Sequence, residues 1–224
     1  MHFLRIDGPI FRFLETITNL LLLNLLFLIC SIPVVTIGPA LTATYYVALK
    51  IVRKEEAGIV KSFFHSFREN FKQSLFLGLG ILVLAALLIA DLNVLTYVST
   101  INEGLAKALL TITILLLLVL VMTSVYVFAV LAQFDNTTKE LLKWSAILVL
   151  RHFPVTLISV ILVAVPVLCL LFLPGFFLQT ILPIMLLMGF SGIAYLQSSL
   201  YVRVFAYYMP EEEQPEDASE EEIL

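Results

Sequence analysis

The stretch Ser31–Lys72, SIPVVTIGPALTATYYVALKIVRKEEAGIVKSFFHSFRENFK, decides the fold because it combines a strong turn, a row of polar side chains and a dense basic cluster. Pro33 and the pair Gly38-Pro39 end the apolar helix that precedes them. The returning segment 39–52 is short for a membrane span, which takes about 20 apolar residues. It either crosses as a short tilted helix or forms a re-entrant segment, and both alternatives remain open at this point.

The composition identifies an integral membrane protein. Of 224 residues, 61% are hydrophobic and only 13% are charged, whereas soluble domains carry about 25% charged residues. We expect one helical transmembrane domain over residues 1–209. The segment 210–224 holds eight of the seventeen acidic residues, and such a run of like charge predicts a disordered cytoplasmic tail.

The apolar runs predict an all-α polytopic membrane protein with six transmembrane helices, the second of them short. Between them, polar and basic segments predict two amphipathic helices that lie in the membrane interface. The expected spans cover residues 14–35, 39–52, 74–90, 108–131, 153–173 and 178–207, and the interfacial helices cover 61–72 and 138–151.

The first interfacial segment carries the clearest pattern. At 100° per residue its phenylalanines gather in one sector and its charged residues lie opposite. This arrangement is typical of a helix whose rings enter the acyl boundary while its cations face anionic headgroups. The lipid-interface anchors predicted here are Lys61, Phe63, Phe64, Phe67, Arg68, Phe71 and Lys72.

The interfacial segment is partly repeated later in the chain. Lys61 and Phe71, followed by Ser74-Leu75, match Lys143 and Phe153, followed by Thr156-Leu157, at a constant offset of 82 residues. In both places a basic helix turns into an outgoing span. This partial repeat suggests that the last four spans are two parallel copies related about an axis along the membrane normal.

The positions of the cations predict the orientation. Every Lys and Arg except Lys107 falls on one side when the N-terminus, the 50–72 segment, the 139–151 segment and Arg203 are cytoplasmic. The positive-inside rule therefore predicts that both termini lie in the cytoplasm.

Polar residues in the apolar runs are candidates for contacts. Asn19 and Asn24 in the first span need partners in hydrocarbon, and helix-to-helix hydrogen bonds are the favoured interpretation. The stripe that includes Arg203 at the end of the last span favours a packing face over a conduction path. The candidate partner or ligand contacts are Thr36, Thr42, Thr44, Tyr45, Tyr46, Gly192, Tyr195 and Ser199.

Motifs that would indicate an enzyme are missing from the sequence. It contains no GxxxxGK[ST], HExxH or GxSxG, and Cys30 and Cys169 lie in apolar runs without a second cysteine or histidine nearby. We therefore expect no catalytic residues, no metal and no cofactor. Nucleic-acid binding is also not expected, because contact with anionic lipid headgroups already explains the basic residues that flank the spans.

Three strings carry a resemblance to a known family: IGPALTATYYVALKIVRKEE, KSFFHSFRENFKQS and LLKWSAILVLRHFPVTL. With them the chain resembles, up to Tyr208, the YesL-like family of bacterial integral membrane proteins (domain of unknown function 624). The resemblance implies a small polytopic protein of the bacterial cell membrane, encoded beside carbohydrate ABC importers.

That context implies an accessory, non-enzymatic protein that docks on the permease of such an importer. The contacts would come from the Ser31–Lys72 stretch and the stripe that begins at Gly192. The alternative is an independent small-solute transporter or channel, in which the threonine and tyrosine row from Thr36 to Tyr46 lines the path.

Overall fold

The computed structural model describes residues 9–55, 58–134 and 137–208, and all regular elements in these ranges are helical. The first half contains α1 (Pro9–Cys30), η1 (Val34–Thr36), α2 (Ile37–Val52), α3 (Ile59–Glu69), α4 (Phe71–Ile101) and α5 (Glu103–Gln133). The second half contains α6 (Thr138–Arg151), α7 (Phe153–Phe172), α8 (Pro174–Phe176), η2 (Phe177–Ile181), α9 (Leu182–Ile184), η3 (Met185–Gly189) and α10 (Phe190–Ala206).

Six helical stretches are long and apolar enough to cross a membrane, which confirms a helical multi-pass membrane protein. They are α1, α2 together with η1, α4, α5, α7, and the continuous run from α8 to α10. The acidic tail predicted over 210–224 lies outside the described residues.

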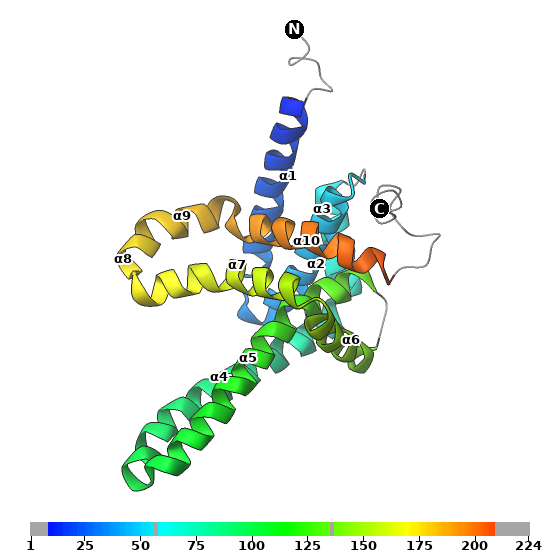
Figure 1. The fold of residues 1–224 in the computed structure, drawn as a ribbon. Helices are drawn as coiled ribbons and strands as arrows, with labels where there is room; N and C mark the ends of the chain where they lie inside the picture. The colour runs from blue at the N-terminus through cyan, green and yellow to red at the C-terminus, as the bar shows by residue number, and fades with distance from the viewer. Residues whose placement is uncertain (1–8, 56–57, 135–136, 209–224) are drawn as a thin grey trace, which may run out of the picture.

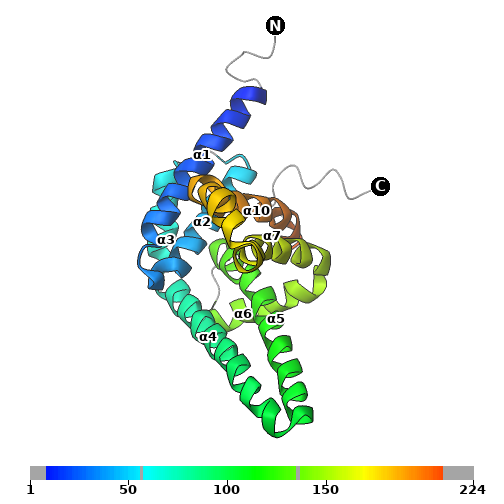
Figure 2. The same cartoon turned by 90° about the vertical axis from the view of Figure 1, so that its left-hand side faces the viewer.

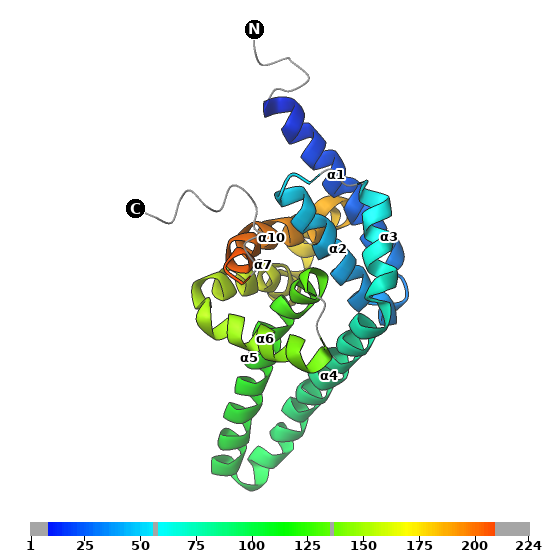
Figure 3. The same ribbon diagram turned by 90° about the vertical axis from the view of Figure 1, so that its right-hand side faces the viewer.

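Two helical hairpins extend from a shared core in different directions (Figure 1). One consists of α4 and α5, and the other of α7 with the run from α8 to α10. The N-terminal part of α1 projects separately, as Figures 2 and 3 also show. The helices therefore form a branched arrangement and not a parallel bundle.

Helix α2 is the centre of the core. In the apolar 18-residue stretch of α2, 56% of the residues are buried, whereas in the corresponding stretches of α4, α7 and the α8–α10 run only 11% are buried. The 16 residues of α2 extend about 24 Å at 1.5 Å per residue, which is less than the hydrocarbon core of about 30 Å. Since neighbouring helices surround it, this short helix is shielded by protein.

The expected loop after residue 90 is wrong, because α4 continues to Ile101. No glycine or proline lies between Gly80 and Gly104 to interrupt it. The turn is at Asn102, whose side-chain oxygen accepts a hydrogen bond from the Leu105 amide at 3.1 Å and caps α5. Helix α4 has 31 residues and so extends about 46 Å.

The partial repeat at an offset of 82 residues is also visible in the local structure. Helix α3 ends at Glu69 and α6 ends at Arg151, and in each case a single residue, Asn70 or His152, precedes the start of a long helix. Ser74 Oγ donates to the Asn70 carbonyl at 2.6 Å, and Thr156 Oγ1 donates to the His152 carbonyl at 3.1 Å. The two short-to-long helix junctions therefore have the same construction.

Helix α3 runs antiparallel beside α2. The Tyr46 and His65 rings lie 6.3 Å apart. Near the N-terminus of α2, Gly38 contacts Ser74 and Gly78 of α4. The start of α2 is thus next to the start of α4.

The contact between α2 and α4 depends on small residues. A Cβ atom added to Gly38 would lie 2.3 Å from the Ser74 carbonyl oxygen, and one added to Gly78 would lie 3.2 Å from Gly38 Cα. Such close approach of two helices in a membrane requires small residues at the crossing. By contrast, a Cβ added to Gly80 would have no neighbour within 4 Å.

We expect Gly38→Ala to destabilise the protein and Gly80→Ala to leave it as stable as the parent or slightly more so. Both substitutions raise helix propensity, but only the first forces backbone against backbone, at a cost of about 1–3 kcal/mol. Thermal unfolding in detergent, followed by circular dichroism, measures the difference. Equal midpoints for the two variants would show that the crossing does not constrain the fold.

Candidate functional site

A buried polar junction joins α2, α7 and α10. The Tyr45 hydroxyl donates to Gln197 Oε1, and Gln197 Nε2 donates to the Ser159 carbonyl at 3.0 Å. The Gln197 side chain is fully buried. Because a buried amide without partners is costly, this chain of hydrogen bonds fixes how the three helices cross.

Three tyrosines extend the junction toward α5. The ring of Tyr201 lies between those of Tyr45 and Tyr126, with centroid distances of 6.4 Å and 4.8 Å. The Tyr201 hydroxyl donates to the Val125 carbonyl at 3.3 Å, and Thr156 Oγ1 donates to the Tyr126 hydroxyl at 3.3 Å. These side chains bond to protein atoms, so the junction is a packed interior.

A second group of buried polar contacts joins α1 to the last span. Asn24 Nδ2 donates to the Met185 and Leu186 carbonyls at 3.1 Å and 2.9 Å, and Asn24 Oδ1 accepts from the Ser191 amide at 3.1 Å. Both carbonyls belong to the π-helical stretch η3, in which the regular α-helical ladder is interrupted. The expected helix-to-helix bonding of Asn24 is confirmed.

The threonine and tyrosine row does not line one continuous path. Thr36 Oγ1 donates to the Cys30 carbonyl at 2.6 Å and closes the turn before α2. Thr42 and Thr44 donate to carbonyls one turn earlier in their own helix. Only Tyr45 enters the polar junction, while half-buried Tyr46 lies beneath the ammonium group of Lys50 at 4.9 Å.

The predicted stripe on the last span is displaced from the buried face. Gly192 and Tyr195 are half-buried, and Ser199 and Arg203 are exposed. Gln197 was the missed signal, because it is the only amide side chain between residues 181 and 206 and an amide in hydrocarbon needs a partner. The buried face of α10 consists of Ser191, Ala194, Gln197, Ser198, Tyr201, Val204, Phe205 and Ala206.

The predicted interface anchors divide into buried and exposed groups. Phe63 is fully buried in the core, which corrects its expected place among lipid, because α2 covers that side of α3. Phe67 and Phe71 are half-buried. Those on the outer surface are Lys61, Phe64, Arg68 and Lys72.

A charged pocket of about 560 Å³ opens where α1, α2 and α10 meet. Lys50 Nζ lies 3.8 Å from Glu55 Oε2, and Arg53 Nη1 lies 3.7 Å from Glu55 Oε1. Arg53 Nη2 also donates to Gln133 Oε1 at 2.7 Å. Burial lowers the pKa of the Arg53 guanidinium, while the Glu55 carboxylate acts in the opposite direction.

The pocket lining combines both signs of charge with apolar residues. It consists of Arg12, Glu15, Thr16, Asn19, Lys50, Lys54, Glu55 and Tyr195, together with Val47, Ile51, Val52 and Ile59. Such a lining suits a polar or zwitterionic solute. No group of three or more His, Cys, Asp or Glu in the ranges that the structure describes could hold a metal ion.

Comparison with known families gives one match. Residues 20–92 match the family described as "Protein of unknown function, DUF624", which confirms the resemblance to domain of unknown function 624 over this stretch. The matched region contains Asn24, all of α2 and α3, and the contact of Gly38 with Ser74 and Gly78. No curated protein and no solved structure matches the chain.

We expect Tyr45→Phe to destabilise the protein by about 1–3 kcal/mol, because Gln197 Oε1 would lose its donor in a buried site. The control is Tyr195→Phe, since the Tyr195 hydroxyl has no hydrogen bond within the part of the chain that the structure describes. Chemical unfolding in detergent compares the two variants. Equal loss in both would mean that the junction does not stabilise the helix crossing.

Proposed function

We propose that this DUF624 protein is a non-catalytic accessory subunit of the bacterial cell membrane that docks on the permease of a carbohydrate ABC importer. The supporting observation is the branched fold, in which two hairpins diverge and leave their apolar sides unpacked. In the apolar 18-residue stretch of each of α4, α7 and the α8–α10 run, only 11% of the residues are buried. This surface is available to lipid or to the helices of a membrane partner.

Small residues on the open sides favour a protein partner. Gly80 on α4 and Gly192 on α10 have open space where a side chain would begin, with no atom within 4 Å. Transmembrane helices associate by close packing at small residues, since apolar surface alone gains nothing over lipid. Each hairpin therefore offers a position where a partner helix can approach closely.

The interior of the protein supports docking over conduction. At the centre, Tyr45 and Gln197 bond to each other, and Asn24 and Gln197 bond to carbonyls of neighbouring helices. The resemblance to a family encoded beside carbohydrate importers is the basis for the choice of partner.

The alternative is an independent small-solute transporter, and the charged pocket is the observation that favours it. Its mixed charges could bind a polar solute from one side of the membrane. Purified protein in lipid vesicles would then transport sugars or ions on its own. Absence of flux in such vesicles would remove this alternative.

We also propose that both termini and the basic helices α3 and α6 lie on the cytoplasmic side, in contact with anionic lipid. The cations of both helices point outward, where headgroups can reach them. The exposed cations in and after these helices are Lys61, Arg68, Lys72, Lys139, Lys143 and Arg151.

This orientation bears on the alternative left open for α2. If α4 starts in the cytoplasmic half of the membrane, then Gly38 lies in that half too, because it packs on Ser74 and Gly78. The turn between α1 and α2 would then remain inside the membrane. Exposed apolar residues at this turn, Ile32, Val34 and Val35, suit that position. We therefore favour a re-entrant α1–α2 hairpin.

Cysteine labelling on intact cells tests this arrangement, in a background with Cys30 and Cys169 replaced by alanine. We expect Gly104→Cys, at the α4–α5 turn, to react with a membrane-impermeant maleimide, and Val34→Cys to remain unlabelled. Equal labelling of both positions from outside would mean that α1 and α2 each cross completely.

Co-purification with a tagged importer in mild detergent tests the docking function. We expect Gly80→Leu and Gly192→Leu to reduce recovery of the permease, because each places a bulky side chain where a partner helix would approach and where an added Cβ atom meets no atom of the protein within 4 Å. Leu87→Phe is the control, since it enlarges a side chain that is already large and 62% exposed. Failure of the parent protein to recover any permease would refute the proposal.

A further inference from the structure

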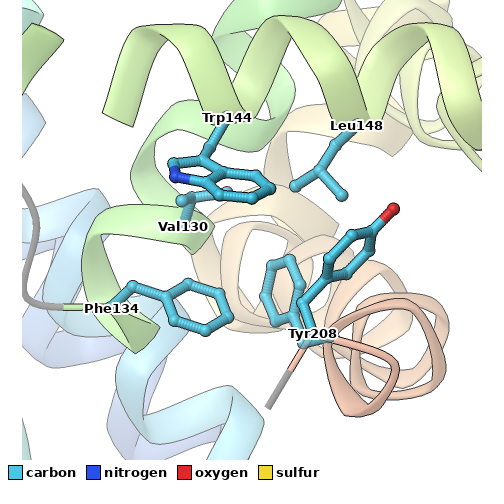
Figure 4. A pocket seen from close by; sticks show the side chains of 6 residues that line it. Val130, Phe134, Trp144, Leu148 and Tyr208 are labelled. Atoms are coloured by element: carbon cyan, nitrogen blue, oxygen red, sulfur yellow. The ribbon is translucent and has the colours of Figure 1, made fainter. Parts of the chain in front are cut away.

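An aromatic pocket of about 220 Å³ lies where α5, α6 and the end of α10 meet (Figure 4). Its walls come from Val130 of α5 and Phe134 directly after it, Trp144 and Leu148 of α6, and Phe205 of α10 with Tyr208 just after that helix. Trp144 and Tyr208 meet edge to face at 6.0 Å. The pocket is open, and Trp144 is 41% exposed, so an apolar segment could enter it.

Basic side chains flank this pocket. The Arg151 guanidinium lies over the Tyr207 and Tyr208 rings at 5.0 Å and 5.6 Å. Lys139 and Lys143 are exposed on the same helix as Trp144. The exposed charges of α6 are thus three cations against one carboxylate, Glu140, so the helix beside the pocket is net positive.

The segment after the pocket has the complementary composition. Tyr208 lines the pocket and continues directly into 209–224, MPEEEQPEDASEEEIL, which is outside the described residues. This segment carries eight carboxylates followed by Ile223 and Leu224. Fourteen residues lie between Tyr208 and Ile223, enough for a reach of up to about 50 Å.

We propose that segment 209–224 folds back on its own protein, with Ile223 and Leu224 in the aromatic pocket and its carboxylates along the basic side of α6. The covalent link raises the local concentration of the segment to about the millimolar range, so weak contacts suffice. Opposite charges on the two surfaces favour the same placement. The docked segment would cover the α6 cations and keep them from anionic lipid or an acidic partner.

This inference is independent of the importer, since both surfaces belong to one chain. It also assigns the acidic segment an intramolecular role, in place of a solvated tail without contacts.

Trp144 is the only tryptophan in the chain and lines the pocket, so its fluorescence reports occupancy directly. The experiment compares the full chain with a variant that ends at Tyr208, both in nanodiscs of zwitterionic lipid. Removing the segment should shift Trp144 emission to longer wavelength and increase quenching by acrylamide. A synthetic peptide of residues 209–224 should reverse both changes.

Two further measurements separate the charge and apolar contributions. High salt should move the full chain toward the truncated form, because it screens the carboxylates from the α6 cations. Replacing Ile223 and Leu224 with serine should expose Trp144 while retaining all eight charges.

Three results would overturn the proposal. The first is identical emission and quenching with and without the segment. The second is a difference that appears only as protein concentration rises, which would mean that the segment enters a second copy. The third is an equal response of both forms to anionic lipid together with no response to the peptide, which would make the pocket a lipid site.

Discussion

Gly38 carries no side chain at the point where α2 crosses α4, and the arrangement of the core depends on that close contact. With the Ser74 carbonyl only 2.3 Å from where a Cβ atom would stand, the two backbones meet directly. The crossing sets the start of α4 beside the start of α2 and holds α3 along the side of α2. Through α2 it also fixes Tyr45 opposite Gln197 of α10. A contact near the N-terminal third of the chain thereby positions the second hairpin.

In this core, hydrogen bonds supply the specificity that apolar packing between helices lacks. Helices in lipid gain little by burying apolar surface, so polar pairs and small residues choose the partners. Asn24 selects the π-helical part of the last span, and Gln197 joins α2 to α7. Outside this centre the two hairpins leave most of their surface to the membrane environment. The core is therefore defined by a few polar side chains, and the arms are available for other contacts.

Composition and periodicity predicted the helical class, the number of candidate spans and the short helix before each of α4 and α7. These features follow from local patterns of apolar residues and charges. The sequence could not locate Phe63 in the core, because its apolar sector fits lipid and protein equally well. It could not select the buried face of α10, since two polar stripes lie about one residue apart. The end of α4 was missed because Asp91 and Asn93 resemble a loop when their hydrogen-bond partners, Thr113 on α5 and the Ile89 carbonyl of α4, are unknown.

The hydrogen bond between Thr113 and Asp91 has a consequence for biosynthesis. Asp91 lies inside the apolar span of α4, and its carboxylate accepts from Thr113 Oγ1 at 2.6 Å on the following helix. A lone carboxylate is costly in hydrocarbon, and its partner is synthesised 22 residues later. If α4 entered the lipid before α5 emerged from the ribosome, the Asp91 carboxylate would lie in the apolar layer without its hydrogen-bond donor. The two helices should therefore leave the translocon together, as a preformed pair.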